Sequence, residues 1–265
     1  MRRTRAFLLA ALLATSAAGS AAGPQGDFVR IEGRRFESVL PPAPGVREAE
    51  VASFLLQRTP VTNAQFRKFV VEHPEWQRGR AAALFVDPGY LRGWATPTDP
   101  GAGEAPQRPV VGVSWFAATA YCEAQGARLP SWYEWEWAAA ADETVADARK
   151  DPVWRQRLLT WYSTPGGNAP RPVAQGKANM HGVHDLHGLV WEWVQDAGAL
   201  MVSADNREQG DPDLMKFCGT GALSMEQKEN YAVLMRIAML SSLEARYTTA
   251  NLGFRCARDL PGRQP

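Results

Sequence analysis

The stretch from Ala120 to Trp137, AYCEAQGARLPSWYEWEW, constrains the fold more than any other, because it specifies two helices and the turn between them. Ser114 is placed to cap a helix that begins at Trp115. Gly126 is the residue type that most often ends a helix, since glycine accepts a left-handed conformation. The spacing therefore predicts a helix from Trp115 toward Gly126.

A second helix follows after a short connector. Ser131 and Glu134 have the spacing of a capping box, which predicts a helix from Trp132 to about Ala141. Its indoles cannot all face one way, because residues two apart, such as Trp135 and Trp137, project from different sides of a helix. We therefore expect at least one of them to pack outside the main apolar stripe: Trp132, Trp135 or Trp137.

Three further segments match a known family in the same order as this stretch. They are PVTNAQFRKFV from Pro60 to Val70, NMHGVHDLHGLVWEW from Asn179 to Trp193, and GFRCAR from Gly253 to Arg258. Together with the 120–137 stretch they resemble the formylglycine-generating, sulfatase-modifying factor family. The resemblance implies an irregular α+β domain over residues 27–260, with a modified C-type lectin-like architecture and little regular secondary structure.

The composition and one local signal agree with such a domain. Ten tryptophans and 19 prolines, with few long periodic segments, favour loops and short strands over long helices. Thr62 and Gln65 form a capping box that predicts an early helix ending before Pro74, with one apolar face made by Phe66, Phe69 and Val70. Residues 97–109 read as a polar surface loop, whereas residues 142–156 are charged and ambiguous.

The N-terminus has the pattern of a secretory signal. Three arginines precede an apolar run over residues 6–14 and small residues up to Ala22, so we expect cleavage of residues 1–22 and a periplasmic or secreted protein. The run is shorter than the roughly 18 apolar residues of a membrane span. The 29 basic residues, less the three arginines of the leader, against 28 acidic residues leave a formal charge of −2. That charge argues against nucleic acid as a partner.

The cysteines depart from the pattern of the family. Its oxidase binds copper through two cysteine thiolates that follow an "RGGS" strand, but the corresponding segment here has only Cys218 until Cys256 is reached. Met225 and Met235 could offer thioether sulfur to Cu(I), yet a thioether has no acidic proton and cannot become an anionic ligand. We therefore do not expect formylglycine formation by the two-cysteine route.

The resemblance places the segments headed by Cys218 and Cys256 close together as strands. Export to an oxidising compartment then favours a disulfide between these two residues. The alternative is that they form a redox-active or copper-binding pair. Cys122, on an apolar helix face, is expected to be a buried free thiol.

Calcium is a second cofactor that the resemblance raises. The family uses the asparagine of "GNVWEW" to hold the ion, and this position is Leu189 here, which has no oxygen for a hard cation. Glu192 remains as a candidate ligand. We favour the alternative that Glu192 pairs with a buried arginine such as Arg255.

The only conspicuous metal-like spacing belongs to His181, His184 and His187. Imidazoles three residues apart could converge on zinc or copper in a suitable turn. The glycines at 182 and 188 argue against a regular helix there, so turn formation is the favoured interpretation.

Candidate ligand contacts lie where the family shapes its substrate cleft. Trp191 would lie beneath the cleft, and arginines and phenols around it could hold a carboxylate or peptide oxygen: Tyr231, Arg236, Arg246 and Tyr247. The alternative is that these residues serve surface and strand packing.

Two function classes follow from the resemblance. In the first, the protein is an exported maturation factor that modifies or assembles another periplasmic molecule, as do family members without the cysteine pair, such as the pyoverdine-maturation type. In the second, it is a non-catalytic lectin-fold module that binds a peptide, glycan or partner protein. Either way we expect a monomer that acts on a peptide, protein or small molecule.

Overall fold

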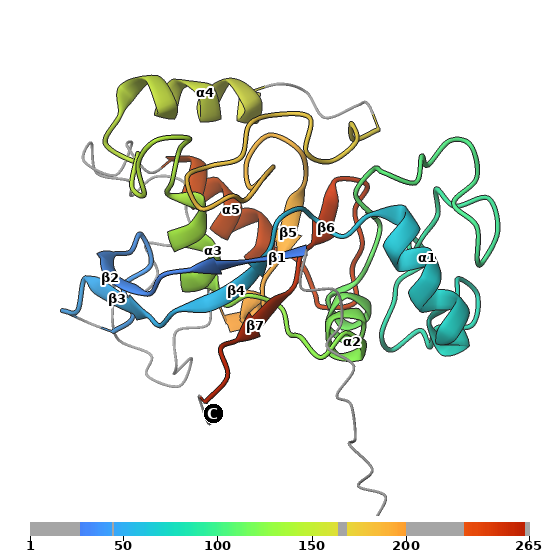
Figure 1. Ribbon diagram of the computed structural model, residues 1–265. Helices are drawn as coiled ribbons and strands as arrows, with labels where there is room; N and C mark the ends of the chain where they lie inside the picture. Colours follow the sequence, from blue (N-terminus) through green and yellow to red (C-terminus); the bar gives the residue numbers. More distant parts are fainter. Residues whose placement is uncertain (1–26, 44, 164–168, 200–230, 263–265) are drawn as a thin grey trace, which may run out of the picture.

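The computed structural model describes residues 27–43, 45–163, 169–199 and 231–262. Within these ranges the elements are short, from strands of three residues to a helix of 12 residues, and long loops connect them. Figure 1 shows helices and strands mixed along the chain rather than gathered into separate layers. The expected α+β fold with little regular secondary structure is confirmed.

Two antiparallel sheets are built mainly from the N-terminal part of the chain. One has the strand order β1-β4-β7, from Phe28–Ile31, Phe54–Gln57 and Ala257–Asp259. The other is the hairpin of β2 (Arg34–Glu37) with β3 (Glu48–Val51). Because β4 pairs with both β1 and β7, the two ends of the domain are joined in one sheet.

A parallel pair of strands crosses the centre of the molecule. In it β5 (Trp191–Trp193) runs beside β6 (Leu252–Phe254), with Glu192 opposite Gly253. A Cβ atom at Gly253 would lie 2.6 Å from the carbonyl oxygen of Val110, so this position admits only glycine without a backbone shift. The pair thus brings the WEW segment against the last strands of the chain.

Three helices have the local capping that the sequence predicts. They are α1 (Asn63–Glu72), α2 (Trp115–Ala124) and α3 (Trp132–Ala139). Both capping boxes are formed, and the N-cap side chains are those of Thr62, Ser114 and Ser131. A short 3-10 helix, η2 (Pro74–Trp76), follows α1. The chain turns after α2 at Gly126, whose φ is +62°, and α3 ends two residues before the expected Ala141.

The indoles of α3 point in different directions, as expected. The Nε1 atom of Trp135 donates to the carboxylate of Glu192 on β5 at 2.9 Å. The Nε1 atom of Trp137 instead donates to the carbonyl oxygen of Glu32, next to the β2–β3 hairpin, at 3.0 Å. Both side chains are buried, so α3 is an internal helix that links the hairpin to the central strand pair.

The ambiguous charged segment leads into α4 (Pro152–Ser163). A short η3 (Ala197–Ala199) lies between β5 and α5 (Tyr231–Ser241) in the chain. We expected the segment after Cys218 to supply strands, but its described part is the helix α5. The reason is the spacing of its buried residues, which is four and then three positions: Val233, Ile237 and Leu240.

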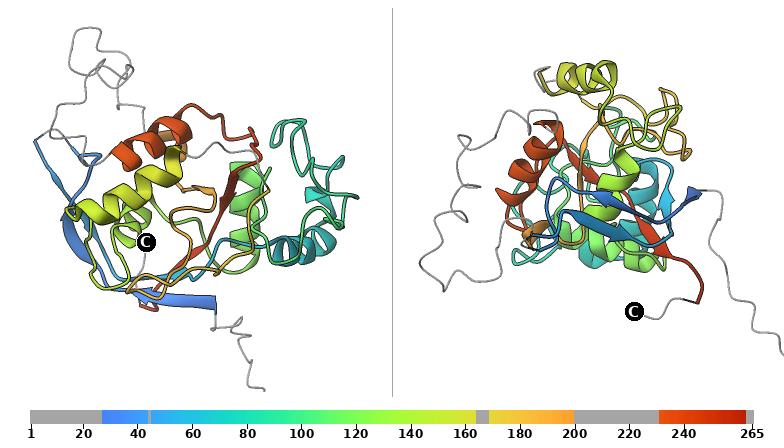
Figure 2. Two further views of the ribbon diagram at one scale, coloured as in Figure 1. Left: turned by 90° about the horizontal axis from the view of Figure 1, so that it is seen from above. Right: turned by 90° about the vertical axis from the view of Figure 1, so that its left-hand side faces the viewer.

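The helices are divided by the central strand pair. In Figure 1, α1 and α2 lie on one side of β5 and β6, and α3, α4 and α5 lie on the other. Figure 2 shows the same division from above, with α4 packed beside α5. Among the described residues, no helix combines the length and apolar character that crossing a bilayer requires.

The disulfide corrects two predictions. Cys256 is bonded to Cys122, with the two Cα atoms 5.6 Å apart, so the expected Cys218–Cys256 bond and the expected free thiol at Cys122 are both wrong. The cause is a pairing of distant backbone segments, in which Arg128 and Ala257 exchange two hydrogen bonds of 2.9 and 2.7 Å. This pairing holds the end of α2 beside the segment between β6 and β7. Cys218 lies outside the described residues.

Candidate functional site

A buried ion pair holds the centre of the site. The carboxylate of Glu192 accepts two bonds from the guanidinium of Arg255, at 2.7 and 2.9 Å, and a third from Trp135. Both charged side chains are 0% exposed. The remaining donors of Arg255 reach the carbonyl oxygens of Gln57, Arg58 and His184. The predicted pairing of Glu192 with Arg255 is therefore confirmed.

The second buried guanidinium, that of Arg236, has no ion-pair partner among the described residues. It projects from α5 over the ring of Trp135, with 3.5 Å from the guanidinium carbon to the ring centroid, and donates to the carbonyl oxygen of Glu192. Its Nε atom is buried and has no partner. Burial lowers the pKa of Arg236 to about 10, although the Glu192 carboxylate opposes this. The interior thus holds two guanidinium groups around one carboxylate.

Three aromatic rings lie next to this charged centre. Trp161 and Tyr162 come from the end of α4 and pack on Trp191 at the start of β5, with ring centroids 4.5 to 5.6 Å apart. We call this group the aromatic trio. All three side chains are half-buried. Burial raises the pKa of the Tyr162 phenol, so it keeps its proton at neutral pH, and the charge of Arg236 lowers that pKa in part.

The predicted ligand contacts do not form one group. Trp191 and Arg236 both lie near Tyr162. The ring of Trp191 packs on the ring of Tyr162, and the guanidinium of Arg236 interacts electrostatically with the Tyr162 phenol. Arg246 and Tyr247 lie beyond α5, where both contact the exposed carboxylate of Glu244 at 3.0 Å. Within the described residues, no hydrogen bond, ion pair or ring contact joins these two to Trp191 or Arg236. Tyr231 begins α5, and its side chain lies outside what the structure describes.

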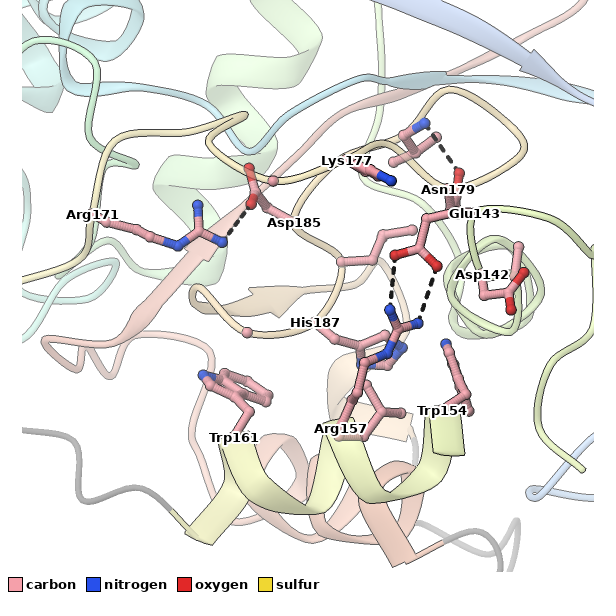
Figure 3. A pocket seen from close by; sticks show the side chains of 16 residues that line it. Asp142, Glu143, Trp154, Arg157, Trp161, Arg171, Lys177, Asn179, Asp185 and His187 are labelled. Atoms are coloured by element: carbon pink, nitrogen blue, oxygen red, sulfur yellow. Dashed lines mark hydrogen bonds and ion pairs between the residues drawn. The ribbon is translucent and has the colours of Figure 1, made fainter. Parts of the chain in front are cut away.

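A pocket lies between α4 and the loop of residues 171–188. Its volume is about 260 Å³. Figure 3 shows α4 on one side, carrying Trp154, Arg157 and Trp161, and Lys177 across from it. We call this cavity the α4 pocket. None of the predicted ligand contacts whose side chains are described, namely Trp191, Arg236, Arg246 and Tyr247, lines it.

Two ion pairs occupy much of the polar wall of the α4 pocket. Arg157 binds Glu143 through both terminal nitrogens, at 2.9 and 3.2 Å. Arg171 binds the buried carboxylate of Asp185 at 2.9 Å, and the same carboxylate accepts the Ala174 amide. Both pairs are drawn in Figure 3. Because each carboxylate already faces a guanidinium, these pairs contribute little net charge to the pocket.

The sequence contained a signal for α4 that our prediction missed. Asp151 and Pro152 are an N-cap residue and a proline at the first helical position, and the Asp151 carboxylate accepts the Val153 amide at 2.8 Å. Trp154 and Leu158 are buried one turn apart. This pattern could have indicated the helix, and with it the wall of the α4 pocket.

The three histidines do not share a site. His184 Nδ1 lies 3.0 Å from the Gly176 carbonyl oxygen, and His187 Nε2 lies 2.9 Å from that of Ala139. The ring of His181 instead lies against Trp137. In the part of the chain that is described, no three His, Cys, Asp or Glu side chains are grouped to hold a metal ion. The arrangement gives no support to the metal-site alternative, because each ring has its own local partner.

His187 forms part of the wall between the α4 pocket and the buried arginines. Its ring packs against Trp135 on one side and Trp154 on the other, with centroids 5.6 Å apart in both cases. Burial is the main cause that lowers the pKa of His187 to about 4; the bond with the Ala139 carbonyl opposes the shift, and the positive charges of Arg236, Arg255 and Arg157 add to it. The imidazole is therefore neutral at pH 7, and its Nδ1 atom has no partner.

The residues present do not fit either metal that the family resemblance raised. Copper held by two thiolates would need two free cysteines, but two of the three cysteines are bonded to each other. Calcium would need oxygen ligands, but Leu189 offers none from its side chain. The Glu192 carboxylate is already bound by Arg255 and Trp135.

Comparisons with known proteins place the chain among related domains. The family described as "Sulfatase-modifying factor enzyme 1-like domain" matches residues 15–260. The "Inactive C-alpha-formylglycine-generating enzyme 2" of Bos taurus is 28% identical, and the match covers 90% of each chain. The structure of PvdO from Pseudomonas aeruginosa superposes with a TM-score of 0.45 and 18% identity, over 88% of this chain and 94% of that one.

Two further relatives match over a shorter region. The formylglycine-generating enzyme of Streptomyces coelicolor is 33% identical over 58% of this chain and 54% of its own length. The hercynine oxygenase of Mycolicibacterium smegmatis is 35% identical over 55% of this chain and 37% of its own length. The chain thus matches about half of the first protein and about a third of the second.

Proposed function

Because the chain belongs to the family of the sulfatase-modifying factor enzyme 1-like domain, we propose that it is an exported maturation factor that acts without the two-cysteine route to formylglycine. Its substrate is another exported molecule, a peptide, a protein or a small compound. The signal-like N-terminus supports export. The fold alone does not support this function, since one fold hosts several chemistries.

The observation that carries the proposal is the Cys122–Cys256 bond. The chain has three cysteines, so this bond leaves Cys218 as the only cysteine that can be a thiol. A single thiolate cannot supply the pair of anionic sulfur ligands that the formylglycine route uses. The domain is therefore better suited to binding and positioning a substrate than to oxidising a cysteine by that route.

We expect the purified protein to leave a sulfatase-type cysteine peptide unchanged when copper is added, because it lacks the second thiolate. Mass spectrometry of the peptide checks this, with the Streptomyces coelicolor enzyme as the positive control. A copper-dependent conversion of the cysteine by the purified chain would contradict the proposal.

The alternative function is a binding module without turnover. The similarity to a relative named inactive, over 90% of this chain, favours it. The two functions differ in the molecules that accumulate when the protein is removed. If it is a maturation factor, deletion in the source organism leaves an unmodified precursor of shifted mass in the exported fraction. If it is a binding module, deletion leaves all masses unchanged.

Two arginine variants locate the functional surface within this assay. Arg236→Met keeps the side-chain volume while it removes a charge that is buried without a carboxylate, so we expect the free energy of unfolding to stay within about 1 kcal/mol of the wild type. Arg246→Ala removes the exposed ion pair with Glu244 and should change the free energy of unfolding by less than about 0.5 kcal/mol. If both arginines contact the ligand, each variant fails to complement the deletion although it is folded.

Lys68→Met, at an exposed position of α1, is the matched control and should complement fully. Full complementation by both arginine variants would remove Arg236 and Arg246 from the proposed site. Unfolding of Arg236→Met would show that its guanidinium serves packing instead.

A further inference from the structure

The α4 pocket has a distinct charge pattern. Its cations and carboxylates are mostly matched in pairs, namely Arg157 with Glu143 and Arg171 with Asp185. Lys177 differs, because it lines the pocket and has no ion-pair partner among the described residues. Lys177 is therefore the cation of the described wall that no ion pair holds, although the lining carries three cations and three carboxylates in all.

The carboxylate that remains on the wall is held by backbone groups. Asp142 accepts the amides of Thr144 and Val145 at 2.6 and 2.7 Å, and also the Thr144 hydroxyl. These donors stabilise its charge, since backbone amides favour the ionised carboxylate. Every carboxylate of the described wall thus already accepts hydrogen bonds, although Asp142 keeps its negative charge.

The wall behind the pocket is also positive. His187 lies between the cavity and Arg236, whose charge has no ion-pair partner in the part of the chain that the structure describes. After burial, the positive charge of Arg236 is the next largest cause that lowers the pKa of His187. The potential that reaches the α4 pocket from the interior therefore favours an anion.

Most of the remaining lining is apolar and partly flat, apart from Asn179 and His187. Trp154 and Trp161 line the α4 side of the pocket, with Leu158 between them, and Val183 and Leu186 add aliphatic surface. Flat rings pack well against indoles, and such contacts contribute beyond the area they bury. A cavity of about 260 Å³ accommodates a molecule about the size of one aromatic amino-acid side chain.

We propose that the α4 pocket binds a small organic carboxylate with a flat apolar ring, with Lys177 holding the carboxylate and Trp154 and Trp161 packing against the ring. The ammonium of Lys177 forms a charge-assisted hydrogen bond with the ligand, which is stronger than a bond between neutral groups. The site adjoins the proposed maturation cleft, because Trp161 of its wall packs on Trp191, but no predicted ligand contact with a described side chain lines it.

The test uses three probes of one shape and different charge, namely phenylacetate, phenylacetamide and phenethylamine. Calorimetric titration of the full mature chain at fixed salt should show binding of phenylacetate. The amide should bind at least tenfold more weakly, and the amine should not bind. Equal affinity for the acid and the amide, preference for the amine, or failure of all three to bind would overturn the proposal.

Lys177→Met should weaken phenylacetate binding at least tenfold while the melting temperature stays unchanged, because the side chain is exposed and unpaired within the described chain. Lys68→Met removes one charge from α1, on the other side of the strand pair, and should leave the affinity unchanged. If both lysine variants weaken binding equally, only the net charge of the protein matters and the proposed role of Lys177 is wrong. The cellular assay of the maturation function is independent of this result.

Discussion

Glu192→Gln is expected to lower the free energy of unfolding by about 3–5 kcal/mol, which is the usual cost of removing one partner from a buried ion pair. The carboxylate of Glu192 is 0% exposed and faces Arg255, while Arg236 lies over the neighbouring indole of Trp135. Without this charge, the two buried guanidinium groups of Arg236 and Arg255 would have no carboxylate partner among the described residues. Because whole domains are stable by only about 5–15 kcal/mol, this loss is large. Urea unfolding at neutral pH measures it.

The double variant Glu192→Gln with Arg255→Met separates charge pairing from packing. If the two side chains stabilise the fold as a pair, the double variant is less destabilised than the sum of the single variants, by about 0.5–3 kcal/mol. Additive effects would contradict this. Glu244→Gln is the matched control, since its partner Arg246 is exposed and surface pairs contribute about 0–1 kcal/mol.

The same charge excess explains why Arg236 is informative about function. A protein that only needed stability would place an apolar side chain over Trp135, since replacing buried charges with apolar groups is often neutral or stabilising. Positions that keep a locally unfavourable group are expected at functional sites. Arg236 is such a position, and the α4 pocket lies on the other side of His187 from it.

Elements with local hydrogen-bond signatures could be predicted from the sequence. The capping boxes at Thr62 and Ser131 place α1 and α3 because each box is closed by a residue three positions later. The end of α2 at Gly126 is equally local. The spacing of the tryptophans also showed that α3 must be buried on more than one side, and its contacts with both Glu32 and Glu192 confirm this.

Features that depend on contacts between distant segments could not be predicted in this way. The disulfide partner of Cys256 is decided by the pairing of Arg128 with Ala257, and no local pattern reports such a pairing. The expected strand after Cys218 followed a resemblance, although the apolar spacing of α5 is that of a helix. Here the local pattern was the better guide.

The candidate site was predictable only in part. Glu192 and Arg255 were expected to pair, because buried charges rarely lack partners. The structure shows this ion pair. The α4 pocket was not predicted. One of its walls comes from residues 142–156, whose only evident feature in the sequence is their charge, and the other comes from the loop of residues 171–188, which the sequence indicated only as turns. Only folding brings Arg157 to Glu143 and Lys177 to the far side of the cavity.

The second large effect is expected when the disulfide is removed. In the chain-entropy model, a cross-link over a sequence separation of 134 residues stabilises by about 5 kcal/mol, because it restricts the unfolded chain. The variant with Cys122→Ala and Cys256→Ala should therefore lose about 4–5 kcal/mol in urea unfolding. Alanine avoids leaving an unpaired thiol in the core, where both cysteines are 0% exposed. A loss below about 1 kcal/mol would show that the bond does not stabilise the native chain.

Peptide mapping under non-reducing conditions distinguishes this bond from the alternatives. The mature protein should yield one linked peptide that contains Cys122 and Cys256, and Cys218 should be the only cysteine that an alkylating reagent labels after denaturation. Cys218→Ser should leave the linked peptide intact. A linked Cys218–Cys256 peptide would reverse the assignment and return Cys122 to the thiol state. Such a link would also favour the redox-active alternative for Cys218 and Cys256, because reduction of that bond would free two thiols.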